Sequence, residues 1–465
     1  MKSNVIDEIV KNDLCIGCGT CAGVCPHKVL EIEDNKYGEY VPCEVQACDS
    51  RCGLCLEVCP FRNNENETQM GAKIYGSIEG INYLLETGYY LDSYVGYSNN
   101  FRQSSASGGM ATWLLTKLLK EDVVDYVVCP SPQKNSEKLF SFEILKDENF
   151  VKAASGSVYY PVEMSEVIQK IREVPGRYAV TGLPCFIKAL RLVAQKNRKL
   201  RERIVFTIGL VCGQMKSKNY TKYIAALAGN DDFQKVESIY YRGKSPEKFA
   251  SNYYYQFTDE QGSQHKIFWN EGISEAWTNR WFTPNACNYC DDVFAELADV
   301  TFMDAWLPEY SKDSKGTNLV LVRSPEILTL IQEGMEKGEI SANKISVEKV
   351  IQSQAGVLEL KRKQLSYRLY LAGIKGQKVP EKRVKANKDI GLLKAREIKL
   401  KEMMQKESKQ LFLSYCQNNI LEIKEFKSGM NPYLNQGKRL RLLGKLMLPI
   451  RVIKRISKKE GTKNE

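Results

Sequence analysis

The sequence predicts an α/β protein in three parts: a small N-terminal module rich in cysteine, a domain built on a mixed sheet, and a basic helical tail. Nine of the 15 cysteines lie in the first 60 residues. From about residue 95, apolar strand patterns alternate with helical ones. Beyond residue 360, lysine and arginine dominate. We therefore expect domains at residues 1–70, 71–360 and 361–465.

The first cysteine run has the spacing of an iron–sulfur site. It reads C-x2-C-x2-C-x3-C-P and comprises Cys15, Cys18, Cys21 and Cys25. This is the ligand signature of bacterial two-cluster ferredoxins, in which three thiolates hold one 4Fe-4S cluster and the fourth holds the other cluster. The signature therefore requires a second run.

A second run is present, with one extra residue. It reads C-x3-C-x2-C-x3-C-P and comprises Cys48, Cys52, Cys55 and Cys59. Cys43 lies upstream and competes with Cys48 for one ligand position. A bulged loop can absorb one residue, so we favour Cys48. The N-terminal module is thus predicted to be a ferredoxin-type domain with two 4Fe-4S clusters.

Three other uses of these cysteines fit less well. Zinc needs neither the interleaved fourth cysteine nor the prolines. Cys48, Cys52 and Cys55 also have the spacing of a radical-SAM cluster loop, but Cys59 and Pro60 follow at once. A disulfide framework is not expected, because the chain starts without an apolar signal-peptide core. We expect a cytoplasmic protein, and no spanning helix, because no stretch of ~18 apolar residues occurs.

The charge of the chain is uneven. Residues 361–465 hold 28 Lys and Arg against nine Asp and Glu, so the net charge of +11 resides in the tail and the rest carries −8. The tail lacks interleaved aromatic residues, and no nucleic-acid-binding module precedes it. We therefore expect no nucleic-acid partner.

The middle of the chain predicts the elements of the α/β domain in order. A polar stretch at residues 61–71 predicts a linker. The expected helices cover residues 109–119, 163–174, 186–195 and 325–338, and the expected strands cover residues 123–129, 177–181, 204–212, 299–302 and 319–322. Residues 204–212 (IVFTIGLVC) form a continuous apolar run, as a strand covered on both faces requires. Residues 239–269 are rich in Tyr and Phe and predict antiparallel hairpins.

Four further cysteines predict a third metal site. Cys185 and Cys212 each follow a predicted strand, and ligands in open α/β sheets sit beyond the carboxyl ends of strands. Cys287 and Cys290 add a C-x2-C pair, which completes the four thiolates of a 4Fe-4S site. The alternative is that these cysteines fill the core, which is the interpretation we prefer for Cys129 and Cys416.

A serine- and glycine-rich segment opens the helix predicted at residues 109–119. It reads RQSSASGG over residues 102–109, and free N–H groups at a helix N-terminus favour a phosphate. The alternative is a simple helix cap. Neither a G-x-G-x-x-G motif after a strand nor a P-loop is present.

Together these residues resemble the family of coenzyme F-420 hydrogenase/dehydrogenase beta subunits, preceded by a two-cluster ferredoxin domain. The resemblance covers about residues 12–351. Five segments carry it: SGGMATWLLTKLL at 107–119, SGSVYYPV at 155–162, TGLPC at 181–185, IGLVCG at 208–213 and CNYCDDVFAELADVTFMDAW at 287–306.

The resemblance implies a flavoprotein with FAD, or FMN, and an additional 4Fe-4S cluster. The cluster ligands map onto Cys185, Cys212, Cys287 and Cys290. The flavin-site residues map onto Arg102, Ser107, Gly108, Gly109 and Thr112, with Ser155, Ser157, Tyr159, Thr181 and Asp304 as further candidates. Asp304 is expected to shape the surroundings of the cofactors rather than to transfer protons.

The function expected from the resemblance is electron transfer between ferredoxin or reduced coenzyme F-420 and an organic acceptor. The expected partners are a soluble ferredoxin, or another redox protein, and an organic redox substrate. The protein side chains are expected to position the cofactors and tune their electronic properties, and the cofactors carry out the redox chemistry. The alternative is a non-enzymatic subunit that relays electrons within a larger redox complex. No catalytic residue is assigned, and the acceptor does not follow from the fold.

The tail divides into two segments. Residues 378–427 are lysine-rich and predict a solvated or partner-docking helix. Residues 438–459 (KRLRLLGKLMLPIRVIKRISKK) predict a basic amphipathic segment, interrupted at Pro449, that can lie on an anionic membrane surface. Peripheral membrane contact is therefore expected through this segment.

Overall fold

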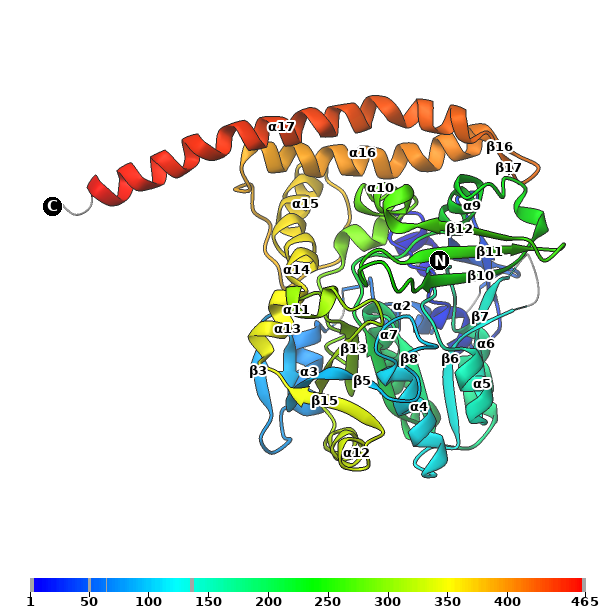
Figure 1. Cartoon of the computed structure of the whole chain (residues 1–465). Helices are drawn as coiled ribbons and strands as arrows, with labels where there is room; N and C mark the ends of the chain where they lie inside the picture. The colour runs from blue at the N-terminus through cyan, green and yellow to red at the C-terminus, as the bar shows by residue number, and fades with distance from the viewer. Residues whose placement is uncertain (1–3, 49–51, 64, 134–137, 462–465) are drawn as a thin grey trace.

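The computed structural model describes residues 4–48, 52–63, 65–133 and 138–461 (Figure 1). A π-helical turn covers Ile6–Val10, and 3-10 turns cover Phe233–Lys235, Trp269–Glu271 and Asn285–Tyr289. The helices are α1 (Thr20–Val24), α2 (Leu54–Glu57), α3 (Glu67–Tyr75), α4 (Met110–Lys120), α5 (Glu148–Ala153), α6 (Ser165–Glu173), α7 (Pro184–Lys196), α8 (Arg198–Arg203), α9 (Lys218–Leu227), α10 (Ile273–Thr278), α11 (Pro308–Ser311), α12 (Pro325–Glu336), α13 (Val347–Ser353), α14 (Ala355–Lys361), α15 (Lys363–Ile374), α16 (Leu392–Tyr415) and α17 (Ile423–Gly461).

The strands form five sheets. They are β1 (Leu30–Asp34), β2 (Tyr40–Glu44), β3 (Asn82–Leu84), β4 (Gly88–Tyr90), β5 (Asp92–Ser98), β6 (Tyr126–Pro132), β7 (Phe140–Leu145), β8 (Tyr178–Gly182), β9 (Ile204–Leu210), β10 (Val236–Gly243), β11 (Tyr254–Asp259), β12 (Gln264–Phe268), β13 (Val300–Asp304), β14 (Asn318–Val322), β15 (Ile340–Lys344), β16 (Cys416–Gln417) and β17 (Ile420–Leu421). Each strand and helix predicted for the α/β domain has a counterpart within a few residues of its expected place.

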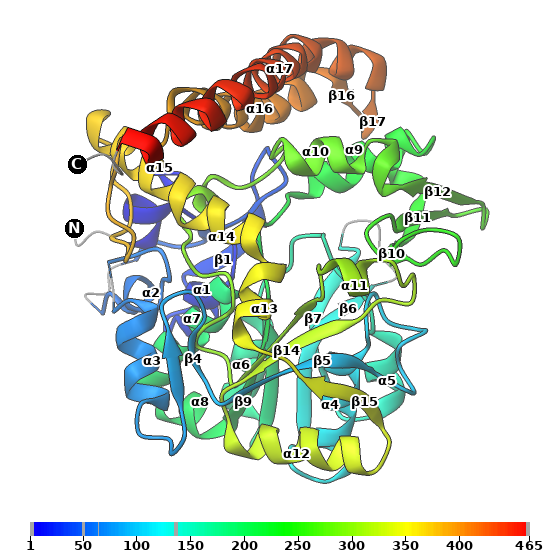
Figure 2. The same cartoon turned by 60° about the vertical axis from the view of Figure 1, so that its left-hand side comes forward.

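The central sheet is mixed, as the sequence predicted. Its eight strands follow the order β15-β5-β14-β13-β9-β8-β6-β7; the neighbours β15, β5 and β14 are labelled side by side in Figure 2. The four inner strands β13, β9, β8 and β6 are parallel to one another, and the outer pairings are antiparallel. In β8, Ala179 joins the buried cluster that contains α4 and α12, while Val180 joins the cluster that contains α6 and α7. Successive side chains on a strand point to opposite faces, so helices cover the sheet on both sides.

The N-terminal module packs directly onto the α/β domain. Helix α1 lies against α6 and α7, and the Met164 backbone N–H donates to the Cys18 carbonyl oxygen at 2.9 Å. Gly19 has a φ of 76°, and a Cβ at this position would lie 2.9 Å from the Met164 nitrogen. A Cβ at Gly23 would lie 2.9 Å from Ile168 Cβ. Glycine at both positions therefore lets the cysteine-rich loop approach α6.

The linker predicted at residues 61–71 is wrong over its second half, where α3 begins at Glu67. Asn66 and Gln69 form a capping box, in which each side chain accepts a hydrogen bond at 3.0 Å from the other residue's backbone N–H. The buried Glu67 carboxylate pairs with Lys188 Nζ at 3.1 Å. The polar composition thus reflects a helix cap and a buried ion pair. Residue 64 lies outside the described residues.

The aromatic segment forms the predicted hairpins, as a three-stranded antiparallel sheet of β10, β11 and β12. The rings of its strands pack on one another, and Tyr159, which precedes α6, packs on Tyr241 and Tyr255. Tyr241 and Tyr255 have ring centroids 4.9 Å apart, and Tyr159 lies 5.0 Å from Trp277. This sheet forms a second, aromatic layer over the carboxyl ends of the central strands (Figure 1).

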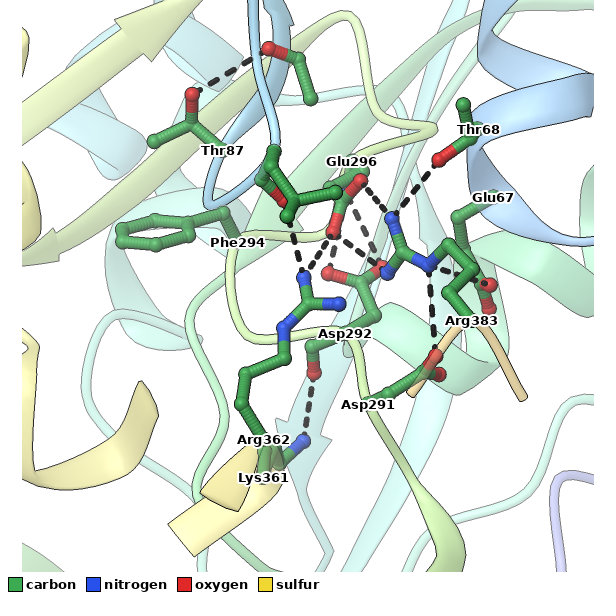
Figure 3. A network of polar contacts seen from close by, with 12 residues as sticks. Glu67, Thr68, Thr87, Asp291, Asp292, Phe294, Glu296, Lys361, Arg362 and Arg383 are labelled. Carbon is green, nitrogen blue, oxygen red and sulfur yellow. Dashed lines mark hydrogen bonds and ion pairs between the residues drawn. The ribbon is translucent and has the colours of Figure 1, made fainter. Parts of the chain in front are cut away.

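The C-terminal region is packed on the body over most of its length. The boundary predicted at residue 360 falls inside α14, and buried basic residues beyond it join ion pairs with the α/β domain (Figure 3). Residues 377–391 form no helix, which corrects the expectation of a helix from residue 378. Helix α16 buries Leu400, Met404, Ser408 and Phe412, one residue on each successive turn. This stripe docks α16 on its own chain, so α16 is not the solvated helix that was one of the two alternatives expected.

Helix α17 runs beside α16 and then continues beyond the body as an arm (Figure 1). The break expected at Pro449 is absent, since α17 extends from Ile423 to Gly461. A proline removes one backbone hydrogen bond, and a helix can continue through that loss. Of the amphipathic segment, the side chains of residues 447–459 lie outside those described. Within the described chain, no helix combines the length and apolarity that crossing a membrane requires.

Candidate functional site

The first group of thiols combines three cysteines of the first run with the last cysteine of the second run. Its members are Cys15, Cys18, Cys21 and Cys59. Burial raises the pKa of Cys21 well above its usual value, and the neighbouring thiols of Cys18, Cys15, Cys59 and Cys55 raise it further. Burial likewise raises the pKa of Cys59 to about 12, with Cys18 among its neighbours. The loop that bears the run turns through Gly17, at a φ of 72°. The sulfur of the last cysteine thus lies beside the first run, as interleaved ligation requires.

The second group lines a small cavity of about 30 Å³ at the outer side of the module. Its four thiols are those of Cys25, Cys48, Cys52 and Cys55. Cys43 does not line this cavity; it lies on β2 and donates to the Glu31 carbonyl oxygen at 3.5 Å. The structure therefore brings Cys48, and not Cys43, to the other three.

The third group is the quartet of Cys185, Cys212, Cys287 and Cys290. Burial, followed by the thiols of the other three, raises the pKa of Cys185 well above its usual value. Cys185 lies in the first turn of α7, directly after β8, and Cys212 lies two residues beyond β9. Because β8 and β9 are parallel neighbours, their carboxyl ends bring these two cysteines together. Cys287 lies in the 3-10 turn at Asn285–Tyr289, and Cys290 follows that turn directly.

The surroundings of the quartet fit an anionic group. Two cationic side chains, Lys361 and Arg280, are buried beside it, and Lys361 Nζ donates to Cys290 Sγ at 3.1 Å. The Met215 backbone N–H donates to Cys287 Sγ at 3.3 Å. A buried cation is costly without a negative partner, and a cluster held by four thiolates supplies that charge. No set of three or more described His, Cys, Asp or Glu side chains is arranged for a single metal ion.

A cavity of about 560 Å³ lies between the central sheet and the aromatic sheet. Eight of the ten predicted flavin-site residues line it: Ser107, Gly109, Thr112, Ser155, Ser157, Tyr159, Thr181 and Asp304. The loop before α4 forms one end, with Gly109 as the N-cap at a φ of 77°. The aromatic rings of Tyr253, Trp269 and Trp277 form another part of the wall. Leu210, which ends the apolar strand β9, is exposed to this cavity.

The other two predicted residues, Arg102 and Gly108, support the loop from behind. Arg102 stacks on the Tyr97 ring at 3.7 Å and pairs with Asp313 at 2.7 Å. A Cβ on Gly108 would lie 2.8 Å from the Asn318 backbone nitrogen. Neither residue lines the cavity. The structure therefore gives them a part in holding the loop rather than in forming the cavity wall.

Asp304 is held by a buried arginine. Both oxygens of its carboxylate accept from Arg242, at 2.7 and 2.8 Å. Arg242 has a φ of 60°, an uncommon backbone conformation for a residue other than glycine. The pair lines the cavity between Tyr253 and Trp306, whose rings lie 4.8 and 5.7 Å from the guanidinium. A fixed ion pair of this kind shapes the cavity wall.

Lys244 follows β10 and reaches the loop before α4. Its Nζ donates to the carbonyl oxygens of Ser107, at 2.8 Å, and of Arg102. Burial and then the charges of Arg242 and Arg102 lower the pKa of Lys244 to about 8. The serine-rich loop is therefore backed by a cluster of cations, which suits an anion.

The three groups of thiols and the cavity follow one another in space. Cys212 belongs both to the quartet and to the cavity wall. Cys18 of the first group is among the electrostatic neighbours of Cys185. Cys55 of the second group is a neighbour of Cys21 in the first. Neighbouring thiols thus lead from the second group through the first group and the quartet to the cavity.

These features define the class of the protein: an iron–sulfur protein in which a dicluster module is docked on an α/β domain with a large cavity. Residues 14–63 match the model of the "4Fe-4S dicluster domain". Residues 93–169 and 176–348 match the models of the "Coenzyme F420 hydrogenase/dehydrogenase, beta subunit", N-terminal and C-terminal parts. The chain belongs to this family of beta subunits, as the resemblance predicted, and carries an N-terminal 4Fe-4S dicluster domain.

Two curated relatives are methanogen proteins. The chain is 24% identical over 329 residues to a subunit of the F(420)H(2) dehydrogenase of Methanosarcina mazei, a match that covers 69% of this chain and 82% of that protein. It is 24% identical over 313 residues to the "Coenzyme F420-dependent sulfite reductase" of Methanocaldococcus jannaschii, a match that covers 64% of this chain but 43% of that protein.

A solved structure shares the fold. A chain of the F420-reducing NiFe hydrogenase complex from Methanosarcina barkeri superposes with a TM-score of 0.50 at 16% identity. The match covers 65% of this chain and 99% of that chain. This similarity shows a shared fold over that part of the chain.

Proposed function

We propose that this protein is an iron–sulfur flavoprotein oxidoreductase that passes electrons between ferredoxin or reduced coenzyme F-420 and an organic acceptor. The single observation that carries the proposal is the double position of Cys212, which belongs to the quartet and to the wall of the large cavity. When bound, the clusters would carry single electrons, and the flavin would combine two electrons with a proton and pass them on as a hydride, or take up a hydride and release the electrons one at a time.

The residues have separate tasks in this proposal. The quartet and the two N-terminal groups of thiols would hold three 4Fe-4S clusters. The loop at Ser107 and Gly109 would receive the flavin phosphate at the N-terminus of α4, with Thr112 one turn further on. The rings of Tyr159 and Trp277 would exclude water from the cavity. Arg242 and Asp304 would hold the wall between the two sheets.

The proposal is tested by reducing the protein anaerobically with one donor at a time. We expect reduced coenzyme F-420 or reduced ferredoxin to bleach the flavin absorbance of the isolated chain. Bleaching by only one of them assigns the donor. If neither reduces the flavin unless a second protein is added, the chain is the relay component of a larger complex, which is the kind of assembly that the Methanosarcina mazei relative's name describes.

Flavin affinity is expected to fall as the pH rises past about 8. Lys244 is charged below that pH and neutral above it, because its pKa is lowered to about 8. Its charge beside the loop of Ser107 would attract the flavin phosphate, so we expect binding to weaken roughly threefold to tenfold between about pH 7 and about pH 9. Flavin titrations of the flavin-free protein measure this. Lys244→Met should bind flavin weakly at both pH values; an unchanged pH dependence in this variant would contradict the assignment.

The arm of α17 is proposed as a peripheral membrane contact. Leu442, Leu443 and Leu446 are exposed on it, at 59%, 44% and 62%. Lys438, Arg439, Arg441 and Lys445 are exposed beside these leucines. No Asp or Glu occurs between Glu425 and Glu460. Exposed leucines with basic neighbours and no acids suit an anionic bilayer surface.

Truncation after Gly437 is expected to abolish sedimentation of the protein with phosphatidylserine vesicles. The truncated chain keeps the part of α17 that buries Phe426, Met430 and Leu434, so its fold should persist. Phosphatidylcholine vesicles serve as the uncharged control. Equal sedimentation of the full and truncated chains would rule out the arm as a membrane contact.

A further inference from the structure

Lys361 is a buried cation that contacts a quartet sulfur and no carboxylate. It is the last residue of α14, and its side chain is buried. Its Nζ donates to Cys290 Sγ at 3.1 Å and to the Asp292 carbonyl oxygen at 2.7 Å. Within the described part of the chain, it forms no ion pair with an acid. Its positive charge is therefore directed at the quartet.

Arg280 is a second buried cation beside the quartet. It is 2% exposed, and its backbone has a φ of 63°. Its Nη2 donates to Asn288 Oδ1 at 2.9 Å, while Nε and Nη1 have no hydrogen-bond partner among the residues that the structure describes. The charged groups that act most strongly on Arg280 are Cys287, Glu402 and Cys212. Of these, Glu402 already pairs with Arg368 at 3.3 Å. A buried guanidinium with two unpaired nitrogens requires a negative charge nearby.

The neighbouring carboxylates of Asp291 and Glu296 are neutralised by other cations (Figure 3). Arg383 pairs with Glu296 at 2.6 Å and with Asp291 at 3.4 Å, and Arg362 pairs with Glu296 at 3.1 Å. The Asp292 carboxylate accepts the Glu296 backbone N–H at 3.1 Å. Asp292 acts on the charge of Lys361 as well, but less strongly than the thiols of Cys290 and Cys212, and no ion pair joins the two side chains among the described residues.

The first group of N-terminal thiols has the opposite surroundings. The sulfurs of Cys15 and Cys18 accept from neutral donors, the Gly17 N–H and the Thr20 hydroxyl, both at 3.4 Å. The charged groups that act on these thiols are acids: Glu39 on Cys15 and Glu163 on Cys18. Glu39 is partly neutralised by Lys409 at 2.5 Å. No positive charge comparable to Lys361 faces this group among the described residues.

We propose that Lys361 and Arg280 are the counter-charges of a cluster held by the quartet, and that they make it the most readily reduced of the three clusters. The inference rests on the proposed function, because it needs the third cluster. A positive charge at a poorly solvated site stabilises the more negative, reduced state and raises the reduction potential. The chain's own charges would then favour movement of one electron at a time from the N-terminal module toward the cavity.

The test is a redox titration of the complete, anaerobically purified protein, followed by electron paramagnetic resonance. The signal that disappears in Cys185→Ala identifies the cluster of the quartet. In the unmodified protein we expect this signal to appear at the highest potential. Lys361→Met should lower the reduction potential of this cluster by at least about 59 mV, which is a tenfold change in the equilibrium constant for one electron. The other two signals should keep their potentials.

Three variants make the result specific. Lys361→Arg keeps the charge and should keep the potential. Lys361→Gln keeps an N–H donor without the charge; it should lower the potential and replaces the methionine variant if that protein fails to fold. Lys117→Met removes a buried cation that pairs with Glu121 and Glu339, and should change no potential.

The outcomes separate the two proposals. Two signals in the unmodified protein, with about eight irons, would overturn the third cluster itself. Three signals, with that of the quartet at or below the others, would overturn this inference alone. An unchanged potential in both Lys361→Met and Lys361→Gln would overturn it as well.

Discussion

Replacing Cys212 with alanine is expected to remove about four irons per chain and to stop electron transfer from the N-terminal module to the flavin. Cys212 is the one thiol that lies both in the quartet and in the cavity wall. Its loss is therefore expected to interrupt electron transfer at the last step before the flavin. We expect the flavin to remain bound and to be reduced at least about a hundredfold more slowly by ferredoxin, since each factor of ten corresponds to about 1.4 kcal/mol of barrier. Iron analysis and anaerobic stopped-flow absorbance measure the two effects.

The matched control is Cys129→Ala. Cys129 is also buried and also lines the cavity, but it is not one of the quartet thiols. We expect this variant to keep its full iron content and its rate of flavin reduction. Equal iron content in the Cys212 and Cys129 variants would mean that the quartet is a group of core cysteines.

Replacing Arg383 with methionine is expected to destabilise the protein by about 3–5 kcal/mol. The guanidinium is 6% exposed and pairs with Glu296 at 2.6 Å and with Asp291 at 3.4 Å. Its removal leaves two buried carboxylates with fewer partners, which costs more than the ion pair itself contributes. Denaturant unfolding of the complete protein measures the change.

Arg198→Met is the control for this prediction. Arg198 pairs with Glu202 at 2.6 Å, but its side chain is 80% exposed. Exposed ion pairs contribute about 0–1 kcal/mol, so this variant should unfold close to the unmodified protein. If both variants lost the same small amount of unfolding free energy, the ion pairs of Figure 3 would not hold the C-terminal region on the body.

Sequence alone could predict most of the thiols that the structure brings together, because the cysteines of each N-terminal run lie close together along the chain. The choice of Cys48 over Cys43 followed from the same spacing, and the structure places Cys48 with Cys25 around one cavity. The quartet was harder, since its thiols come from three segments. The rule that parallel strands share an open edge was enough to bring Cys185 and Cys212 together.

The cations around the quartet could not be predicted in this way. Lys361 and its sulfur partner Cys290 lie 71 residues apart, and the lysine belongs to a region whose charge indicated a solvated tail. Arg280 carries no motif, and only its burial shows that it requires an anion. Long-range ion pairs depend on how elements pack, and composition does not record that. The same limit explains why α3 was predicted as a linker. Its polar composition comes from a capping box and from Glu67, whose buried ion pair the sequence does not reveal.

Eight of the ten predicted flavin-site residues line the cavity, whereas Arg242 in its wall and Lys244 behind the loop were missed. Arg242 lies near the end of β10, and Lys244 directly follows that strand. The aromatic content of this segment predicted hairpins and gave no sign of a site. Arg242 reaches Asp304 over 62 residues, and Lys244 reaches the loop at Ser107 over 137 residues. A basic residue at the end of an aromatic strand gives no sign of its partner.

The measurement that tests the central claim most directly is the iron, acid-labile sulfide and flavin content of the anaerobically purified chain. We predict about twelve irons, as three 4Fe-4S clusters require, together with one flavin. About eight irons and no flavin would contradict the account: the Cys185 quartet would then consist of core cysteines, and the chain would be a relay protein with two clusters.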